Sequence, residues 1–191
     1  MATGEQTGFA HRILVVDDEP LLLETAAVIF RQKGYEVRTA TDGFAALVEL
    51  RRATPDVIVS DLSMPRMSGF ELLSIVRRRF PHVAVIGISG EYQGIAPHGL
   101  ICDAFFWKGH YAPDEMLSKI AELLERAPLR PHLAKPDKAP VWVPSSNGGY
   151  LVVTCTECLR SFSVPREKGG QHLHQTHCLF CDSVVSFLTE V

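Results

Sequence analysis

The chain has 191 residues, a hydrophobic share of 46% and a formal net charge of −3, values typical of an ordinary globular protein. No stretch is long and apolar enough to cross a bilayer, and residues 1–11 lack the regions of a secretory signal, so we expect a cytoplasmic protein without membrane contact. The small negative net charge does not favour binding to nucleic acid.

From about residue 12 to residue 126, apolar runs alternate with segments of helical periodicity. The runs are continuous and rich in β-branched residues, as in strands of a parallel sheet that helices cover on both faces. We expect five strands, over 13–16, 37–40, 57–60, 83–88 and 104–107. We expect helices that begin near Pro20, Gly43, Gly69 and Pro113. The pattern predicts an α/β fold with a doubly wound, five-stranded parallel sheet.

One interval of this part does not favour a regular helix. Between Ser89 and Cys102 the chain contains Gly94, Pro97 and Gly99, each of which opposes helix formation. We therefore expect the fourth helix of the alternation to be short or irregular.

Aspartates close two of the predicted strands. Asp17 and Asp18 follow the first strand, and Asp61 follows the third. Right-handed crossovers place the first and third strands side by side at a switch point of the sheet, so the three carboxylates should meet. They would repel one another unless a cation lay between them, and Mg²⁺ prefers such oxygen ligands. The pattern predicts phosphoryl chemistry at a magnesium site.

Segments 13–20 and 61–72, together with Ser89 and Lys108 after the fourth and fifth strands, resemble the receiver domain of bacterial response regulators. The resemblance covers roughly residues 10–126 and implies a flavodoxin-like fold. It also implies a phosphoprotein for signal transduction in a two-component phosphorelay, which a sensor histidine kinase phosphorylates. Such a protein is not an enzyme, apart from self-catalysed phosphorylation and dephosphorylation of its aspartate.

By that resemblance, Asp61 accepts the phosphoryl group. Asp18 binds Mg²⁺ directly and Asp17 assists, together with Asp61 and the backbone carbonyl of Ser63. A metal is needed here because attack of a carboxylate on a phosphoryl group brings two anions together.

The same resemblance gives roles to residues after the fourth and fifth strands. Lys108 supplies an ammonium group to the phosphoryl oxygens, and Ser89 donates a hydroxyl hydrogen bond to the phosphate. Phe105 matches the aromatic residue that switches position, although simple core packing explains it equally well. Gly109 stands where the family usually has proline, so we do not expect the family's cis peptide bond there. The usual output surface is therefore in question.

Five prolines recur between residues 127 and 149 without apolar periodicity, which predicts an extended linker. Within it, the segment 141–143 (Val-Trp-Val) either docks on a domain or remains a loose part of the linker. The remaining residues, 150–191, form a separate small domain in this interpretation.

Two CxxC pairs, Cys155 with Cys158 and Cys178 with Cys181, are separated by nineteen residues. Four sulfurs at this spacing suit tetrahedral Zn²⁺, and with short apolar runs around them the segment resembles a β-rich zinc ribbon. A domain this small needs the metal for much of its folding energy, so the Zn²⁺ would be structural.

Other residues near the cysteine pairs have simpler interpretations. His172, His174 and His177 are expected to be polar loop residues, although one of them could replace a cysteine as ligand. Cys102 is expected to be a buried apolar residue. Charged residues from 149 onward sum to −1 without a basic stripe, which argues against DNA and favours a protein partner.

The leading hypothesis is a cytosolic response regulator with an N-terminal receiver and a C-terminal zinc ribbon. Its rivals are a receiver-like scaffold that works without phosphorylation and a metal or redox sensor that uses the CxxC pairs. The sequence shows no nucleophile–base arrangement of a stand-alone hydrolase.

Overall fold

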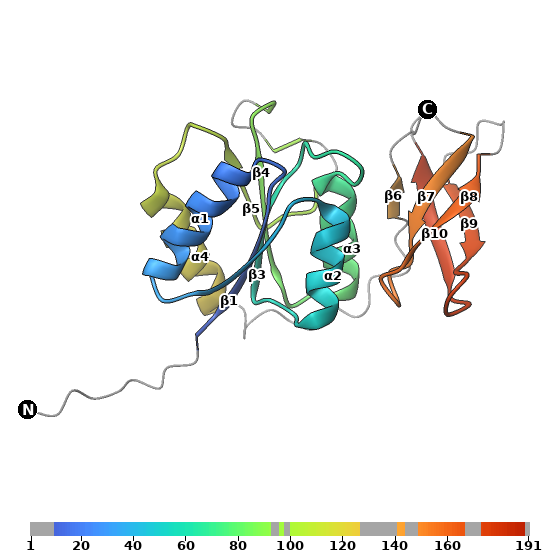
Figure 1. Cartoon of the computed structure of the whole chain (residues 1–191), viewed down its shortest axis with the longest axis horizontal. Coiled ribbons are helices and arrows are strands. Elements are labelled where there is room, and N and C mark those ends of the chain that lie inside the picture. The colour runs from blue at the N-terminus through green and yellow to red at the C-terminus, as the bar shows by residue number, and fades with distance from the viewer. Residues whose placement is uncertain are drawn as a thin grey trace, which may run out of the picture.

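The chain forms an α/β part that ends at Arg126 and a smaller β-rich part that follows it (Figure 1). The computed structural model describes residues 10–92, 96–97, 100–126, 141–143, 149–166 and 173–189, with the backbone only for 141 and 142. Within these residues, no helix has the length and apolar character that crossing a membrane requires.

Five strands form one sheet in the order β2-β1-β3-β4-β5, and every pairing is parallel. The strands are β1 (Arg12–Val16), β2 (Glu36–Ala40), β3 (Val57–Asp61), β4 (Ala84–Ser89) and β5 (Ala104–Trp107). The order reverses between β1 and β3, so the predicted doubly wound sheet with its first and third strands adjacent is confirmed. Strand β4 is shifted by one residue, which makes Ser89 its last residue.

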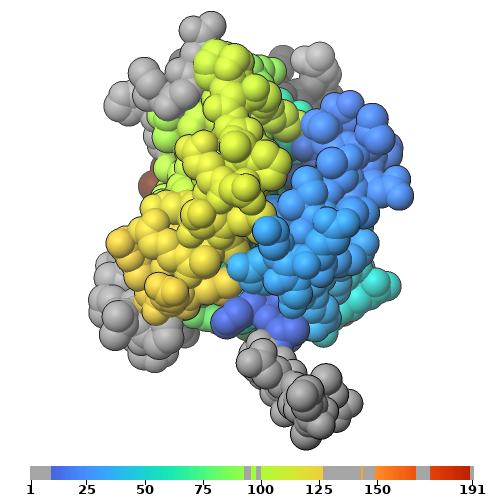
Figure 2. All heavy atoms as spheres, turned by 90° about the vertical axis from the view of Figure 1, so that its left-hand side faces the viewer, coloured from blue at the N-terminus to red at the C-terminus, as the bar shows by residue number. Residues whose placement is uncertain are grey.

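Helices cover both faces of the sheet. Helices α1 (Pro20–Gln32) and α4 (Pro113–Arg126) lie on one face, which Figure 2 shows from outside, and α2 (Gly43–Arg52) and α3 (Gly69–Arg79) lie on the other. Side-chain oxygens of Asp42 and Ser68 accept backbone N–H groups in the first turns of α2 and α3. All four predicted helix starts are confirmed.

The two faces of the sheet have separate apolar cores. Leu14 and Val16 of β1 pack with α2 and α3, whereas Ile13 and Val15 pack with α1 and α4. Because side chains of a strand alternate between faces, a sheet covered on both faces needs apolar residues at every position. This explains the continuous apolar runs in the sequence.

The connection from β4 to β5 contains no helix among its described residues, 90–92, 96–97 and 100–103. Asp103 fixes the end of this connection, since its carboxylate accepts from the Val85 N–H at 2.8 Å and from the Arg77 guanidinium at 2.7 Å. This agrees with the predicted loss of regular helix. Gly94 and Gly99 lie outside the described residues.

The β-rich part consists of two small sheets. Its strands are β6 (Val141–Val143), β7 (Tyr150–Thr154), β8 (Ser161–Pro165), β9 (Leu173–His177) and β10 (Val184–Thr189). Strands β7 and β8 form an antiparallel pair, while β10 pairs with β9 and with β6. The predicted linker therefore contains a strand of the C-terminal sheet.

The histidine prediction needs a correction. His174 and His177 lie in strand β9 rather than in a loop, while His172 lies outside the described residues. The strand was missed because its alternating residues are partly exposed and polar, without the apolar run that marks a buried strand.

Candidate functional site

Two neighbouring strands bring the predicted metal-binding aspartates together at the carboxyl edge of the sheet. Asp17 directly follows β1, and Asp61 is the last residue of β3. One carboxylate oxygen from each of Asp17, Asp18 and Asp61 lies within 4.8 Å of the others. Asp17 and Asp61 are buried and Asp18 is exposed, so the cluster opens to solvent beside Asp18. The side chain of the next residue, Glu19, is also exposed.

Lys108 lies between two of these carboxylates. Its Nζ atom is 2.7 Å from Asp61 Oδ2 and 2.9 Å from Asp17 Oδ2. Its backbone N–H donates to the Ser89 carbonyl at 2.9 Å, which holds the residue beside the end of β4. Burial lowers the pKa of Lys108, but hydrogen bonds and attraction to Asp61 and Asp17 outweigh it and raise the pKa. The side chain therefore stays protonated.

The environment of Asp61 favours a bound cation. Burial raises the pKa of Asp61, while Lys108 and the Ser63 N–H, which donates to Asp61 Oδ1 at 3.2 Å, offset part of that effect. Three carboxylates against one ammonium group leave two negative charges uncompensated in the cluster. Close oxygen donors with this excess charge fit a divalent metal such as Mg²⁺.

Ser89 and Phe105 lie near the cluster on β4 and β5. Ser89 is fully buried, and its hydroxyl accepts the Glu91 N–H at 3.2 Å. Phe105 is half-buried, pairs with Gly87 in the sheet and packs against the core of the α2–α3 side. This packing suits both a core residue and a switch, so its role stays a prediction. The peptide bond from Lys108 to Gly109 is trans.

Residues 13–103 match the family model of the response regulator receiver domain. The chain is similar to the nitrogen assimilation regulatory protein NtrX of Azorhizobium caulinodans, with 43% identity over 84 residues, which are 43% of this chain and 18% of NtrX. It is also similar to the sensory transduction protein RegX3 of Mycobacterium tuberculosis, with 33% identity over 116 residues, 60% of this chain and 51% of RegX3. It thus spans between about a fifth and about half of these relatives.

Among solved structures, the chemotaxis response regulator CheY4 of Vibrio cholerae matches with a TM-score of 0.55 and 27% identity, over 60% of this chain and 99% of CheY4. Residues 13–103 are a response regulator receiver domain. Receiver domains are phosphoacceptors that bind Mg²⁺ at the phosphorylation site, and sensor histidine kinases phosphorylate them. The cluster at the end of β1 and β3 is the candidate for that site here.

The loop after β3 in this receiver contacts the starts of both α2 and α3. Arg66, which has a positive φ of 69°, forms an ion pair with the buried Asp42 at the start of α2. Gly43 packs so closely on Met67 that a side chain there would collide with it. A side chain at Gly69, the first residue of α3, would collide with the Asp61 carbonyl. Sequence reasoning missed these contacts because they join segments that no local pattern connects.

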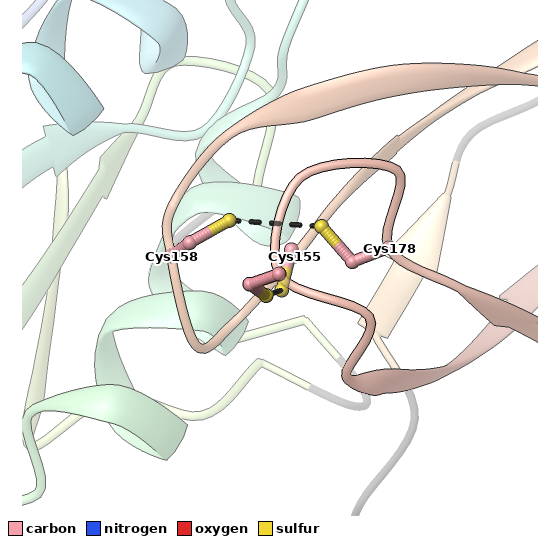
Figure 3. Close-up of side chains that lie close together, drawn as sticks. Cys155, Cys158 and Cys178 are labelled. Atoms are coloured by element: carbon pink, nitrogen blue, oxygen red, sulfur yellow. Dashed lines mark hydrogen bonds between the residues drawn. The ribbon is translucent and has the colours of Figure 1, made fainter.

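The four cysteines of the β-rich part gather at the tips of two turns, and Figure 3 labels three of them, Cys155, Cys158 and Cys178. The Sγ atoms are 3.7 Å apart for Cys155 and Cys181 and 3.6 Å apart for Cys158 and Cys178, and all four lie within 4.8 Å of one another. A tetrahedral Zn²⁺ with bonds of ~2.3 Å to sulfur would hold its ligands roughly 3.8 Å apart. The donor set and its spacing fit zinc.

The two cysteine turns have the same backbone geometry. In the first, Cys155 Sγ accepts the Glu157 N–H, and Leu159 has a positive φ of 56°. In the second, Cys178 Sγ accepts the Phe180 N–H, and a residue with φ of 59° again follows the last cysteine. Backbone donors aimed at sulfur favour thiolates. Burial raises the pKa of the Cys155 thiol to about 12, so a bound cation would be needed to keep it ionised.

Other candidate ligands lie apart from the sulfur cluster. His174 stacks on Phe187 with ring centroids 5.1 Å apart, and His177 Nδ1 lies 3.2 Å from the Asp182 carbonyl oxygen. Neither belongs to the metal-ligand groups found among the described residues. Cys102 is half-buried and packs against the core of the receiver, away from the other cysteines.

Proposed function

We propose that the chain is a response regulator whose Asp61 accepts a phosphoryl group from the phosphohistidine of a sensor histidine kinase. The observation that supports this most directly is the position of Lys108, with Nζ 2.7 Å from Asp61 in a cluster with Asp17 and Asp18. In this proposal residues 10–126 are the receiver, and the protein acts in the cytoplasm.

Transfer joins an Asp61 oxygen to phosphorus as the bond from phosphorus to the kinase histidine breaks. Lys108 neutralises charge on the phosphoryl oxygens, and Ser89 donates its hydroxyl hydrogen to one of them. Mg²⁺, held by Asp17, Asp18, Asp61 and the Ser63 carbonyl, would supply further positive charge to those oxygens. Asp61 itself is aimed by the Ser63 N–H and by Lys108.

The β-rich part is proposed to be a zinc ribbon over residues 150–191, joined to the receiver by residues 127–149. Cys155, Cys158, Cys178 and Cys181 would hold a structural Zn²⁺. Its role would be to contact a protein partner when Asp61 is phosphorylated. The prediction against DNA binding stays a prediction, as does the identity of the kinase.

Incubation of the full chain with acetyl phosphate and Mg²⁺ tests the proposal. We expect the intact mass to rise by one phosphoryl group, and Asp61→Asn to abolish the gain. Asp114→Asn, on the exposed start of α4, is the matched control and should keep it. No gain in the wild type, or a gain that persists in Asp61→Asn, would remove Asp61 as phosphoacceptor.

A scaffold that works without phosphorylation is the second candidate, because no helix lies among the described residues between β4 and β5. Amide exchange with and without phosphorylation separates the two functions. Unchanged protection around Ser89 and Phe105 in fully phosphorylated protein would favour the scaffold.

A further inference from the structure

The β-rich part packs on the outer side of α2 and α3, the side away from the sheet (Figure 1). We call this surface of the receiver the α2–α3 face. Buried residues of α2 and α3 and buried residues of β6, β7 and β10 belong to one apolar cluster. Val143 of β6, the strand next to α3, is 2% exposed. The two parts are therefore docked through apolar contact rather than merely joined.

A hydrogen bond joins α2 to the first cysteine turn. The Arg51 guanidinium donates to the Leu159 carbonyl at 3.3 Å. Leu159 is buried and directly follows Cys158, and its own N–H donates to the Cys155 carbonyl at 2.9 Å. The turn that presents two of the sulfurs thus contacts the receiver.

The buried carboxyl of Glu71 lies on α3, the helix that β6 contacts, and we attribute its burial to the docked β-rich part. Gly69 contacts the end of β3, and Glu71 lies two residues later, about 200° around the helix and so away from the sheet. Its side chain is nevertheless 3% exposed, and its Oε1 atom has no hydrogen-bond partner among the described residues. A buried carboxyl without full pairing weakens the contact that covers it.

Both helices of the α2–α3 face are fixed at their first turns to the loop that follows Asp61. Arg66 forms an ion pair with Asp42 at the start of α2. Gly69 of α3 packs so closely against the Asp61 carbonyl that a side chain would not fit between them. Packed elements of this kind shift together rather than deform. A rearrangement around Asp61 would therefore move both helices.

We propose that the α2–α3 face is the surface through which this receiver signals, and that its partner is the chain's own C-terminal domain, which phosphorylation of Asp61 releases. The inference rests on the proposed function of Asp61. It differs from a general output role because it names the surface, the partner and the direction of the change.

The direction follows from the geometry of the docked form. In the docked form, Lys108 bridges the carboxylates of Asp17 and Asp61. A phosphoryl group on Asp61 takes Lys108 as its own partner and so changes the loop to which α2 and α3 are fixed. The docking contact most sensitive to that change is the one around Glu71, because the Oε1 atom of this buried carboxyl has no hydrogen-bond partner among the described residues. Two sites linked in this way affect each other reciprocally.

The test uses the full chain with acetyl phosphate and Mg²⁺, with intact mass, amide exchange and small-angle X-ray scattering recorded on the same samples. We expect exchange of the β6 amides (residues 141–143) to rise about tenfold, within the usual range of coupling between two sites. The radius of gyration should rise as the parts separate, and Asp61→Asn should show neither change.

A second arm needs no phosphorylation. Arg51→Ala should raise β6 exchange about fivefold, the effect of losing one ordinary hydrogen bond. The matched control is Arg52→Ala, since Arg52 pairs with Glu49 on its own helix. Equal exchange in the two variants would overturn the docking contact. Full phosphorylation with unchanged exchange and radius would overturn the release alone, and the absence of any mass gain would overturn the proposed function and the release with it.

Discussion

At the residue scale, Lys108 has the clearest electrostatic task. Its ammonium group balances two buried carboxylates, at 2.7 Å from Asp61 and 2.9 Å from Asp17. Lys108→Met should lower the rate of phosphorylation by acetyl phosphate on the order of 100-fold, because an aimed charge is lost where charge develops. Time-resolved mass measurement checks this. Lys119→Met, which removes a half-exposed partner of Glu122 on α4, should leave the rate unchanged.

Glu71 predicts a dependence of stability on pH. Burial raises its pKa from 4.5 to about 8, so the folded chain holds a proton that the unfolded chain releases near pH 4.5. The stabilisation by this proton is fully present below about pH 4.5 and is lost as the pH rises through about 8. We expect the free energy of unfolding to be lower at pH 9 than at pH 6, by at most ~3 kcal/mol, because only the part of the shift between pH 6 and about 8 is lost in this range.

Urea unfolding at the two pH values measures that difference. Glu71→Gln stays neutral at both, so most of the difference should disappear in this variant. The control is Glu91→Gln, on the exposed residue after Gly90. A difference between pH 6 and pH 9 that is the same in wild type and Glu71→Gln would show that Glu71 is not the group responsible.

At the scale of elements, the start of α3 is fixed against the end of β3. Gly69→Ala places a Cβ against the Asp61 carbonyl, so either α3 or Asp61 must shift. We expect a loss of ~1–3 kcal/mol, as for other overpacked sites, together with slower phosphorylation. Gly149→Ala is the control, since a Cβ at Gly149 would meet no atom within 4 Å. Wild-type stability and rate in Gly69→Ala would mean that the contact is loose.

The three central strands, β1, β3 and β4, could be predicted because they are buried on both faces and are therefore apolar at almost every position. Strand β9 could not, since its residues alternate between partly and fully exposed. Strand β6 is three residues long and gains its structure from pairing with β10, more than forty residues later. Such pairing leaves no local pattern.

The candidate site, like the fold, could be predicted from the sequence only in part. Asp17, Asp61 and Lys108 follow strands whose order the crossover rule predicts, so their meeting could be expected. The bridge of Lys108 to Asp17 as well as Asp61 depends on side-chain positions that spacing does not define. The burial of Glu71, which we attribute to docking, could not be predicted, because nothing in a helical pattern shows that a second domain covers a polar side.

At the scale of the whole molecule, the docked form connects the cysteine cluster to the receiver. The C-terminal part has a small apolar core, so metal at the four sulfurs should supply much of its stability. Removal of metal by a chelator should abolish amide protection over 149–166 and 173–189 while the receiver stays folded. Cys155→Ser should act like the chelator, whereas Cys102→Ser, outside the cluster, should not.

Loss of the C-terminal part would also uncover α3. The Glu71 carboxyl would then reach water, and its pKa should return towards 4.5 because burial is the cause of its rise. After the chelator has removed the metal, the receiver should therefore be equally stable at pH 6 and pH 9. Urea unfolding, monitored by hydrogen exchange of the α3 amides, measures this stability. If its stability still falls at pH 9 after the C-terminal amides have lost protection, Glu71 is buried by the receiver alone. The docked domain would then not be what covers it.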